Sequence, residues 1–254
     1  MLGRLIKDWL HARTGRSEAR LHEPPVHPAA VDAVRALLRE GGRPAEPYDY
    51  EQIAYLLAGV SSARYMVEHM SGARNLVGRA ALLEYALSQC AVAGLVLEFG
   101  VYTGASLKWI ADRHAGPIHG FDSFEGLPED WTHAQKKGRF SLEGELPDIG
   151  AANAVLHKGW FADTLPAFLA ANPGAVRFAH IDCDLYSSSK TVLELLLPRT
   201  VAGTVLVFDE YLNYPGWEMH EHRAFRETIA ATGRRYEYLA FASTTQCVAV
   251  RMTG

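Results

Sequence analysis

Carboxylate side chains follow two separate apolar segments of this sequence, at the point where each segment ends. Asp182 and Asp184 come directly after the largely apolar stretch VRFAHI, with one cysteine between them. Asp209 and Glu210 directly follow the stretch GTVLVF. Carboxylates held close together repel and raise one another's pKa, and a divalent cation between them removes that penalty. Because hard oxygen ligands favour Mg²⁺, with Mn²⁺ or Ca²⁺ as alternatives, the two pairs indicate a metal site.

The alternative for these acids is structural, with one acid of each pair capping a helix and the other solvated. Two such pairs at one edge of a sheet argue against it. His180 precedes the first pair, and we interpret it as a core residue or a support for the acids rather than a ligand. His220 and His222 are expected on an exposed helix face, from which either could reach a substrate.

The segments that must position these acids have the pattern of short buried strands. From about residue 94 onward, apolar stretches of strand length alternate with amphipathic stretches of helix length. This alternation predicts an α/β fold with a mostly parallel, seven-stranded sheet, helices on both faces and a C-terminal antiparallel hairpin at the edge. The strands are expected at residues 94–100, 117–122, 154–159, 176–184, 203–210, 234–241 and 245–252, and the helices at 104–115, 161–172, 187–199 and 218–232.

Six acids fall at the carboxyl ends of these predicted strands. In open parallel sheets, ligands bind beyond that edge. A common edge for six acids therefore indicates a site rather than ordinary surface. The six are Glu98, Asp122, Asp182, Asp184, Asp209 and Glu210.

The stretch EFGVYTGAS, residues 98–106, has the form of a turn between a strand and a helix. Gly100 and Gly104 allow a close approach of the backbone to a ligand, and the helix start presents free N–H groups. The spacing is not the GxGxxG dinucleotide fingerprint. The acid at Glu98 suits a cationic ligand better than a pyrophosphate, although a simple tight turn is the alternative.

Asp122 ends the second strand, 24 residues after Glu98. An acid at about this distance takes the hydroxyl pair of a ribose through charge-assisted hydrogen bonds, and a solvated helix cap is the alternative. After the third strand, Gly159, Trp160 and Phe161 could form the wall of an adenine site, or serve as core aromatics. Together these residues indicate a nucleoside-containing ligand.

The composition excludes several classes of partner. The 254 residues carry a net charge of -4, with a pI near 6.3, and show no basic stripe for nucleic acid. No apolar run is long enough to span a bilayer, and residues 1–10 lack the pattern of a signal peptide. Three cysteines without metal-ligand spacing predict a reduced, cytoplasmic compartment.

The N-terminal part differs from the α/β pattern. Residues 1–10 fit a short amphipathic helix that packs on the body or on a second subunit, covers a site as a lid, or lies on a membrane surface. Residues 29–40 and 51–90 have helical periodicity, broken at residues 70–72. We expect an N-terminal helical or lid region over residues 1–69 and one α/β domain over 70–254. The apolar face of the first helix comprises Leu2, Leu5, Ile6, Trp9 and Leu10.

Residues 127–150 form a polar, glycine-containing segment that is long for a plain connection. We predict a flexible loop on the substrate side of the site.

Seven motifs in order resemble the macrocin O-methyltransferase family, a group of S-adenosylmethionine-dependent sugar O-methyltransferases of bacterial natural-product pathways. The resemblance runs from about Met70 to Arg226 and implies a class I, Rossmann-like methyltransferase fold over residues 70–254, with S-adenosylmethionine and Mg²⁺ bound together. Residues 129–152 and the N-terminal region do not match, so the acceptor need not be an antibiotic sugar. The motifs are MS, EFGVYTGAS, FDSFEGLPEDW, GWFADTLP, HIDCDLYSSS, FDEY and YPGWE.

The resemblance also assigns roles to residues. It implies that Asp182, Asp209 and Glu210 hold the metal, although the family usually has Asp at the last position. It implies that Asp184 is the general base, next to Asp182 in the catalytic set. The cofactor residues implied by the resemblance are Met70, Ser71, Glu98, Gly100, Tyr102, Asp122, Ser123 and Phe124. The turn at residues 98–106 adds Gly104 and Ser106, and the end of the third strand adds Gly159 and Trp160.

The function expected from this resemblance is Mg²⁺-dependent O-methylation of a sugar or glycosylated small molecule by a homodimer. One alternative is a catechol-type O-methyltransferase, which has Asn where Glu210 stands and acts on a flat aromatic diol. Another is a non-catalytic nucleoside-binding protein. A nicotinamide dehydrogenase is disfavoured because the glycine fingerprint is absent.

Overall fold

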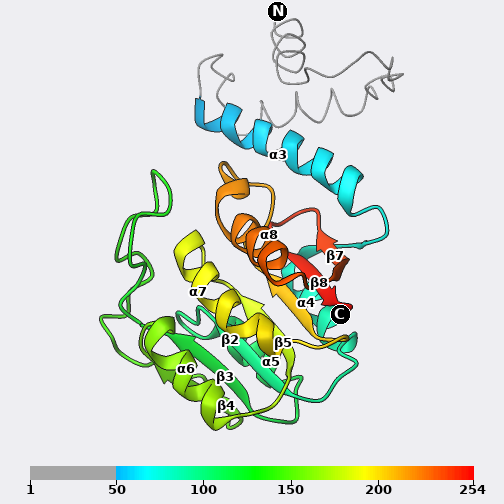
Figure 1. Ribbon diagram of the computed structural model, residues 1–254. Coiled ribbons are helices and arrows are strands. Elements are labelled where there is room, and N and C mark those ends of the chain that lie inside the picture. The colour runs from blue at the N-terminus through cyan, green and yellow to red at the C-terminus, as the bar shows by residue number, and fades with distance from the viewer. Residues whose placement is uncertain (1–49) are drawn as a thin grey trace, which may run out of the picture. The chain divides into compact units, whose positions relative to one another are not determined.

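Eight strands form a single sheet in the computed structural model, which describes residues 50–254 (Figure 1). The order is β1-β7-β8-β6-β5-β2-β3-β4, and only β8 runs antiparallel to its neighbours. The helices expected over residues 1–10 and 29–40 lie outside the described residues. The strands are β1 (Arg74–Leu76), β2 (Leu95–Phe99), β3 (Ile118–Asp122), β4 (Ala154–Lys158), β5 (Val176–Ile181), β6 (Val205–Phe208), β7 (Tyr236–Ala242) and β8 (Val248–Met252).

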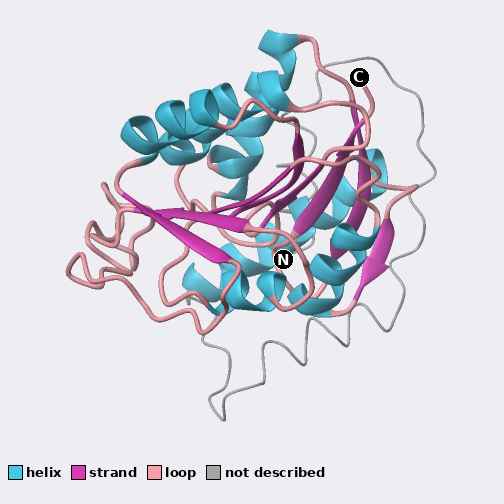
Figure 2. Ribbon diagram, turned by 90° about the horizontal axis from the view of Figure 1, so that it is seen from below, coloured by secondary structure: helices cyan, strands magenta, loops and turns pink. Residues whose placement is uncertain are grey.

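Helices cover both faces of this sheet, as Figure 2 shows. None of the helices within residues 50–254 combines the length and apolar character required to cross a membrane. The helices are α3 (Tyr50–His69), α4 (Gly78–Ser88), α5 (Ala105–Ala111), α6 (Phe161–Ala171), α7 (Tyr186–Leu196) and α8 (Glu221–Thr232), with short 3₁₀ turns at η1 (Leu197–Arg199) and η2 (Trp217–Met219).

The predicted mixed α/β sheet with its antiparallel C-terminal hairpin is confirmed, with two differences. The structure has an eighth strand, β1, inside a segment predicted to be helical. Its three residues are too few to show the alternating pattern of a strand, and they form one because they pair with β7. The hairpin is not at the edge, because β8 lies between β6 and β7 and β1 lies beyond them.

The two faces of the sheet have separate cores, which follow from the alternation of side chains along each strand. One core contains Leu97 and Ile181 with residues of α6, α7 and α8. The other contains Val96 and Phe178 with residues of α4 and α5. By the same alternation, Glu98 and His180 share the face covered by α4, and they are register partners in neighbouring strands.

The ends of β2 and β5 approach each other closely at Gly100. Its φ is +89°, and a Cβ there would lie 1.8 Å from the carbonyl oxygen of Asp182. A glycine is required at this position for two reasons: the backbone conformation is left-handed, and there is no room for a Cβ atom.

We predict that Gly100→Ala destabilises the fold far more than Gly138→Ala does. Gly138 has a similar φ of +80° with nothing within 4 Å of its Cβ position, so its substitution costs only the backbone strain of about 1–2 kcal/mol. Urea unfolding of both variants measures the difference. Equal losses of stability would contradict the close packing of the two strand ends.

Candidate active site

A cleft of about 300 Å³ lies at the carboxyl ends of five neighbouring strands, β6, β5, β2, β3 and β4. The strand order reverses between β2 and β5, which is where open α/β sheets bind ligands. Ten of the residues predicted for the site line this cleft. They are Gly100, Tyr102, Asp122, Ser123, Gly159, Trp160, Asp182, Asp184, Asp209 and Glu210.

Asp122 organises the turn after β2. Its Oδ2 accepts the N–H groups of Val101 and Tyr102, both at 2.8 Å, and its Oδ1 accepts that of Phe124 at 2.7 Å. Tyr102 and Phe124 have positive φ values, 50° and 59°, which these bonds help to hold. Each carboxylate oxygen can accept more than one hydrogen bond, so Asp122 can still receive a ligand hydroxyl.

Six residues predicted for the cofactor do not line the cleft. Met70 and Phe124 are core side chains, and Glu98 is fully buried beneath the cleft. Gly104 faces Ile149, whose Cδ1 lies 2.2 Å from where a Cβ would be. Ser71 is exposed, and Ser106 lies half-buried in α5. Their roles toward a cofactor stay predictions.

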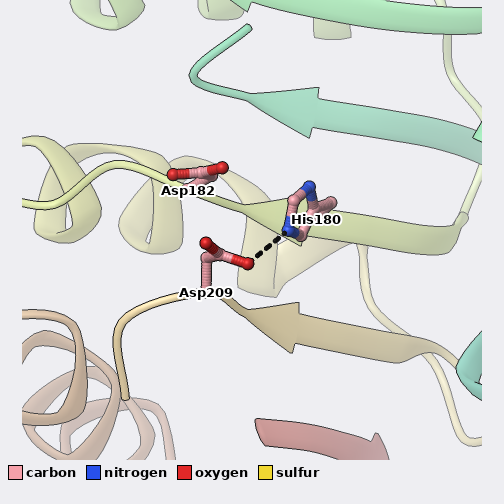
Figure 3. Close-up of side chains that lie close together, drawn as sticks. All are labelled: His180, Asp182 and Asp209. Carbon is pink, nitrogen blue, oxygen red and sulfur yellow. Dashed lines mark hydrogen bonds and ion pairs between the residues drawn. The ribbon is translucent and has the colours of Figure 1, made fainter. Parts of the chain in front are cut away.

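An alternating row of acids and bases runs from the buried Glu98 to the lining of the cleft, and we call it the charge chain: Glu98, His180, Asp209, Arg79 and Asp182. His180 Nδ1 lies 2.8 Å from Glu98 Oε1, and its Nε2 lies 3.4 Å from Asp209 Oδ1 (Figure 3). Arg79 Nε contacts Asp209 Oδ1 at 2.9 Å, and its Nη2 contacts Asp182 Oδ2 at 2.8 Å.

The charge chain shifts the pKa values of its members. Burial alone would lower the pKa of His180, but the hydrogen bonds to Asp209 and Glu98 outweigh it and raise that pKa to about 10. Burial would raise the pKa of Asp209, but the hydrogen bond and charge of His180, together with Arg79, lower it to about 2. His180 is therefore buried and bound to two acids, and its role as a support rather than a ligand stays a prediction, because its ring also lies in a possible ligand group with Asp182 and Asp209.

A second group of acids is compensated only in part, by the contact of Arg79 with Asp182, and we call Asp182, Asp184 and Glu210 the acid cluster. One carboxylate oxygen from each lies within 4.8 Å of the others. Burial and the neighbouring carboxylates raise the pKa of Asp182 to about 7 and that of Asp184 to about 8, and they also raise that of Glu210. Within residues 50–254, the buried Oε2 of Glu210 has no hydrogen-bond partner.

Two functional residues were missed from the sequence, Arg79 and Glu221. Glu221 is fully buried, and its carboxylate accepts the N–H groups of Cys183 at 2.9 Å and Glu210 at 3.1 Å. It therefore fixes the loop after β5 to the loop after β6. In the sequence, Glu221 is one polar residue among several at a helix start and gives no signal.

The exposed positions predicted for His220 and His222 are wrong. Both side chains are partly buried, and burial lowers both pKa values, that of His222 to about 4. The His222 ring packs edge-on against Tyr65 and Trp217, with centroids 4.9 and 4.8 Å away. Helical periodicity could not show that α3 supplies aromatic rings beside this face.

The segment 127–150 borders the cleft on the side predicted for the substrate. Leu127, Trp131 and Phe140 line the cleft. The segment is closed by reciprocal backbone hydrogen bonds around Leu127, and Ser187 donates to Glu129. Its predicted flexibility stays a prediction.

Replacing His180 by Gln is predicted to destabilise the protein by about 3–5 kcal/mol, because the buried Glu98 loses its cation and Asp209 keeps only Arg79. The loss should be largest below pH 6.5 and shrink toward pH 10, since a raised histidine pKa contributes stability that disappears as pH rises. Urea unfolding at several pH values measures it.

His119→Gln is the control, because burial and His157 lower the pKa of His119. The loss of stability caused by His119→Gln should be largest at high pH and should shrink as the pH falls. A His180 variant whose effect does not change with pH would show that the buried imidazole is uncharged.

Comparison with known proteins identifies the domain that carries this cleft. Residues 97–211 match a protein family described as a methyltransferase domain. Over 147 residues the chain is 31% identical to 8-demethyl-8-(2,3-dimethoxy-alpha-L-rhamnosyl)-tetracenomycin-C 4'-O-methyltransferase of Streptomyces olivaceus, a match that covers 47% of this chain and 54% of the relative. The chain thus spans about half the length of the curated relative it matches.

Solved structures share the fold. The calicheamicin methyltransferase CalS11 superposes with a TM-score of 0.54 at 22% identity, covering 94% of this chain and 98% of that one. The O-methyltransferase NovP superposes with a TM-score of 0.53 at 19% identity, covering 80% and 100%. At these identities the likeness concerns the fold alone. Residues 97–211 are thus similar to a methyltransferase domain, and the fold of the described chain is that of solved methyltransferases.

Proposed function

We propose that the protein transfers a methyl group from S-adenosylmethionine to a hydroxyl of a sugar or glycosylated small molecule, with the help of a divalent cation. One observation carries the proposal. Within the segment that matches a methyltransferase domain, the turn after β2 and the acid cluster lie in the same cleft. The relative from Streptomyces olivaceus is named for O-methylation of a rhamnosyl compound, which supports a sugar acceptor.

The cofactor would lie along the turn after β2. Asp122 is held there with lone pairs available for the ribose hydroxyls. Trp160 lines the cleft with 42% of its surface exposed, as a stacking wall for adenine requires. Gly100 keeps the backbone open at the strand end. The other cofactor residues assigned by resemblance are part of the same proposal.

The acids fit a divalent cation. The family resemblance implies that Asp182, Asp209 and Glu210 are the ligands of this cation. The oxygens of Asp182 and Glu210 converge, and the orphaned Oε2 of Glu210 is a buried acceptor that a cation would satisfy. Burial and the neighbouring carboxylates raise all three carboxyl pKa values, and added positive charge would favour the ionised cluster. Oxygen ligands favour Mg²⁺, with Mn²⁺ or Ca²⁺ as alternatives.

The chemistry requires alignment and removal of one proton. The sulfonium methyl is already activated, so holding an acceptor oxygen in line with it can contribute about 7–11 kcal/mol. A bound cation would lower the pKa of an acceptor hydroxyl. Asp184 lies next to Asp182 and Glu210 and borders the cleft, and in this proposal it accepts that proton at a carboxylate oxygen. Trp131 and Phe140 would exclude water on the acceptor side.

The reaction can be tested with labelled S-adenosylmethionine and parallel panels of sugar nucleotides, glycosides and catechols, with and without EDTA. We expect label on a sugar hydroxyl and loss of transfer after chelation. Label on catechols alone would favour an aromatic diol as substrate. Calorimetric binding of the cofactor without transfer to any acceptor would indicate a non-catalytic binding protein.

Asp184→Asn is predicted to lower kcat by about 10²–10⁴-fold, because the base is lost, while cofactor binding changes little. Asp112→Asn is the matched control, because Asp112 is exposed at the end of α5 and pairs with Lys108. Unchanged turnover of the Asp184 variant would remove this residue from the role of base.

A homodimer and a cytoplasmic location remain part of the proposal. Light scattering of the purified chain checks the first, and cell fractionation checks the second.

A further inference from the structure

We propose that α3 holds in place the loop that carries Asp209 and Glu210, and that Ser62 of α3 is a positioning residue for Glu210. Residues 209–216 connect β6 to η2, and we call them the acid loop. Both of its acids line the cleft. The inference rests on the proposed function, in which Glu210 is a ligand of the cation. In this proposal α3 supports the site and is not a lid over it.

The first contact between α3 and the acid loop is at Asn213, three residues after Glu210. The N–H of Asn213 donates to Ser62 Oγ at 2.8 Å, and Ser62 is only 6% exposed. Asn213 has a φ of 67°, a left-handed conformation that non-glycine residues seldom adopt. Its Nδ2 donates to the carbonyl of Thr245 at 3.3 Å, and its Oδ1 lies 3.6 Å from the Cβ position of Gly59. The loop therefore keeps a strained residue where α3 and the β7–β8 turn enclose it.

The second contact is at Trp217, directly after the acid loop. The indole Nε1 of Trp217 donates to Ser61 Oγ at 2.9 Å, and the indole is buried. The ring of Tyr65 packs edge-on against the same indole, with centroids 5.4 Å apart. Two consecutive serines of α3, Ser61 and Ser62, thus bind both ends of the second half of the loop.

The third contact joins α3 to the residue that follows Glu210. The hydroxyls of Tyr65 and Tyr238 share a hydrogen bond, and that of Tyr238 also lies 2.8 Å from the hydroxyl of Tyr211. Tyr211 is fully buried, directly after Glu210 in the chain. The tyrosine hydroxyls therefore connect the end of α3 with the start of the acid loop.

These contacts bear on Glu210 because its carboxylate depends on the backbone that carries it. Its Oε2 has no hydrogen-bond partner within the described part of the chain. The start of the loop is held by other elements. Glu221 accepts the N–H of Glu210 at 3.1 Å, and the carbonyl of Gln246 accepts those of Tyr211 and Leu212 at 3.0 and 3.2 Å. The contacts with α3 then hold the remainder of the loop.

A displacement of the acid loop would change the acid cluster, because one oxygen of Glu210 lies within 4.8 Å of oxygens of Asp182 and Asp184. Those two acids belong to a different loop, the one after β5. The turn after β2, where the cofactor would bind, is held separately by Asp122. Loss of the Ser62 contact should therefore weaken cation binding and leave cofactor binding nearly unchanged.

The test is calorimetric titration of the full chain with Mn²⁺ and, separately, with S-adenosylhomocysteine, for wild type, Ser62→Ala and the control Thr204→Val. The buried hydroxyl of Thr204 accepts the N–H of Val201 at 3.0 Å at the opposite end of β6, so the control removes the same kind of bond. We expect Ser62→Ala to weaken Mn²⁺ binding by about 10- to 100-fold, as changes next to metal ligands do. Its affinity for S-adenosylhomocysteine should stay close to that of wild type, and Thr204→Val should leave both affinities unchanged.

A folded Ser62→Ala variant that binds Mn²⁺ as tightly as wild type would overturn the inference and leave the proposed function intact. An equal loss for both ligands would also overturn it, because that result indicates general destabilisation. Absence of Mn²⁺ binding to wild type would overturn both the inference and the cation in the proposed function, whereas the labelled-methyl assay tests transfer separately.

Hydrogen exchange of the wild-type chain decides the case if Ser62→Ala does not fold. Because coupling between two sites is reciprocal, Mn²⁺ binding should slow amide exchange in α3 around residues 58–66 as well as in the acid loop. Slower exchange in the acid loop alone, with α3 unaffected, would overturn the inference.

Discussion

The balance of charge among carboxylates at the ends of β2, β5 and β6 is the constraint on which the rest of the site depends. Each of these strand ends carries at least one acid, and buried acids repel unless cations or protons compensate them. His180 and Arg79 provide that compensation for Glu98, Asp209 and one oxygen of Asp182. No ion pair reaches Glu210 in the part of the chain that the structure describes, and this asymmetry turns a row of acids into a site with a place for a ligand.

The fold produces this asymmetry through simple geometry. Side chains alternate between the faces of the sheet, so Glu98 and His180 point toward α4, whose first turn carries Arg79. The chain then leaves β6 through Asp209 and Glu210, of which Asp209 contacts Arg79 and His180, whereas the N–H of Glu210 is held by Glu221. Asp184, with φ at 60°, ends the loop after β5 in a conformation that non-glycine residues seldom adopt. Two neighbouring acids therefore have different surroundings, and different chemical properties follow.

The positions of the acids could be predicted from the sequence because they depend on local patterns. Apolar runs of strand length end at Glu98, Asp122 and Asp182, and parallel strands bring their ends to one edge. The partners of those acids could not be predicted in the same way. Arg79 meets Asp182 across 103 positions of the chain, and Glu221 reaches Cys183 across 38. Neither belongs to a motif, and only the packing of α4 and α8 on the sheet brings them there.

The wrong predictions for β1 and His222 also arise from contacts between distant parts of the chain. β1 became a strand through its pairing with β7, although its own three residues have no strand pattern. His222 was placed on the surface by the period of its helix, yet Tyr65 of α3 and Trp217 partly cover it. In each case tertiary contact overrode the local signal. The seven expected strands were predicted because their local pattern and the sheet agree, although β5 and β6 end at Ile181 and Phe208 rather than at residues 184 and 210.

The claim that a divalent cation completes the acid cluster can be measured without any acceptor. A ligand that binds only the native state raises the unfolding temperature, and above Kd the stabilisation grows with the logarithm of the ligand concentration. Thermal unfolding of the full chain in increasing Mg²⁺ or Mn²⁺, with EDTA as reference, should therefore show a Tm that rises with the logarithm of the metal concentration, and Glu210→Gln should abolish the rise. A wild-type Tm that is the same in EDTA and in millimolar metal would contradict the account.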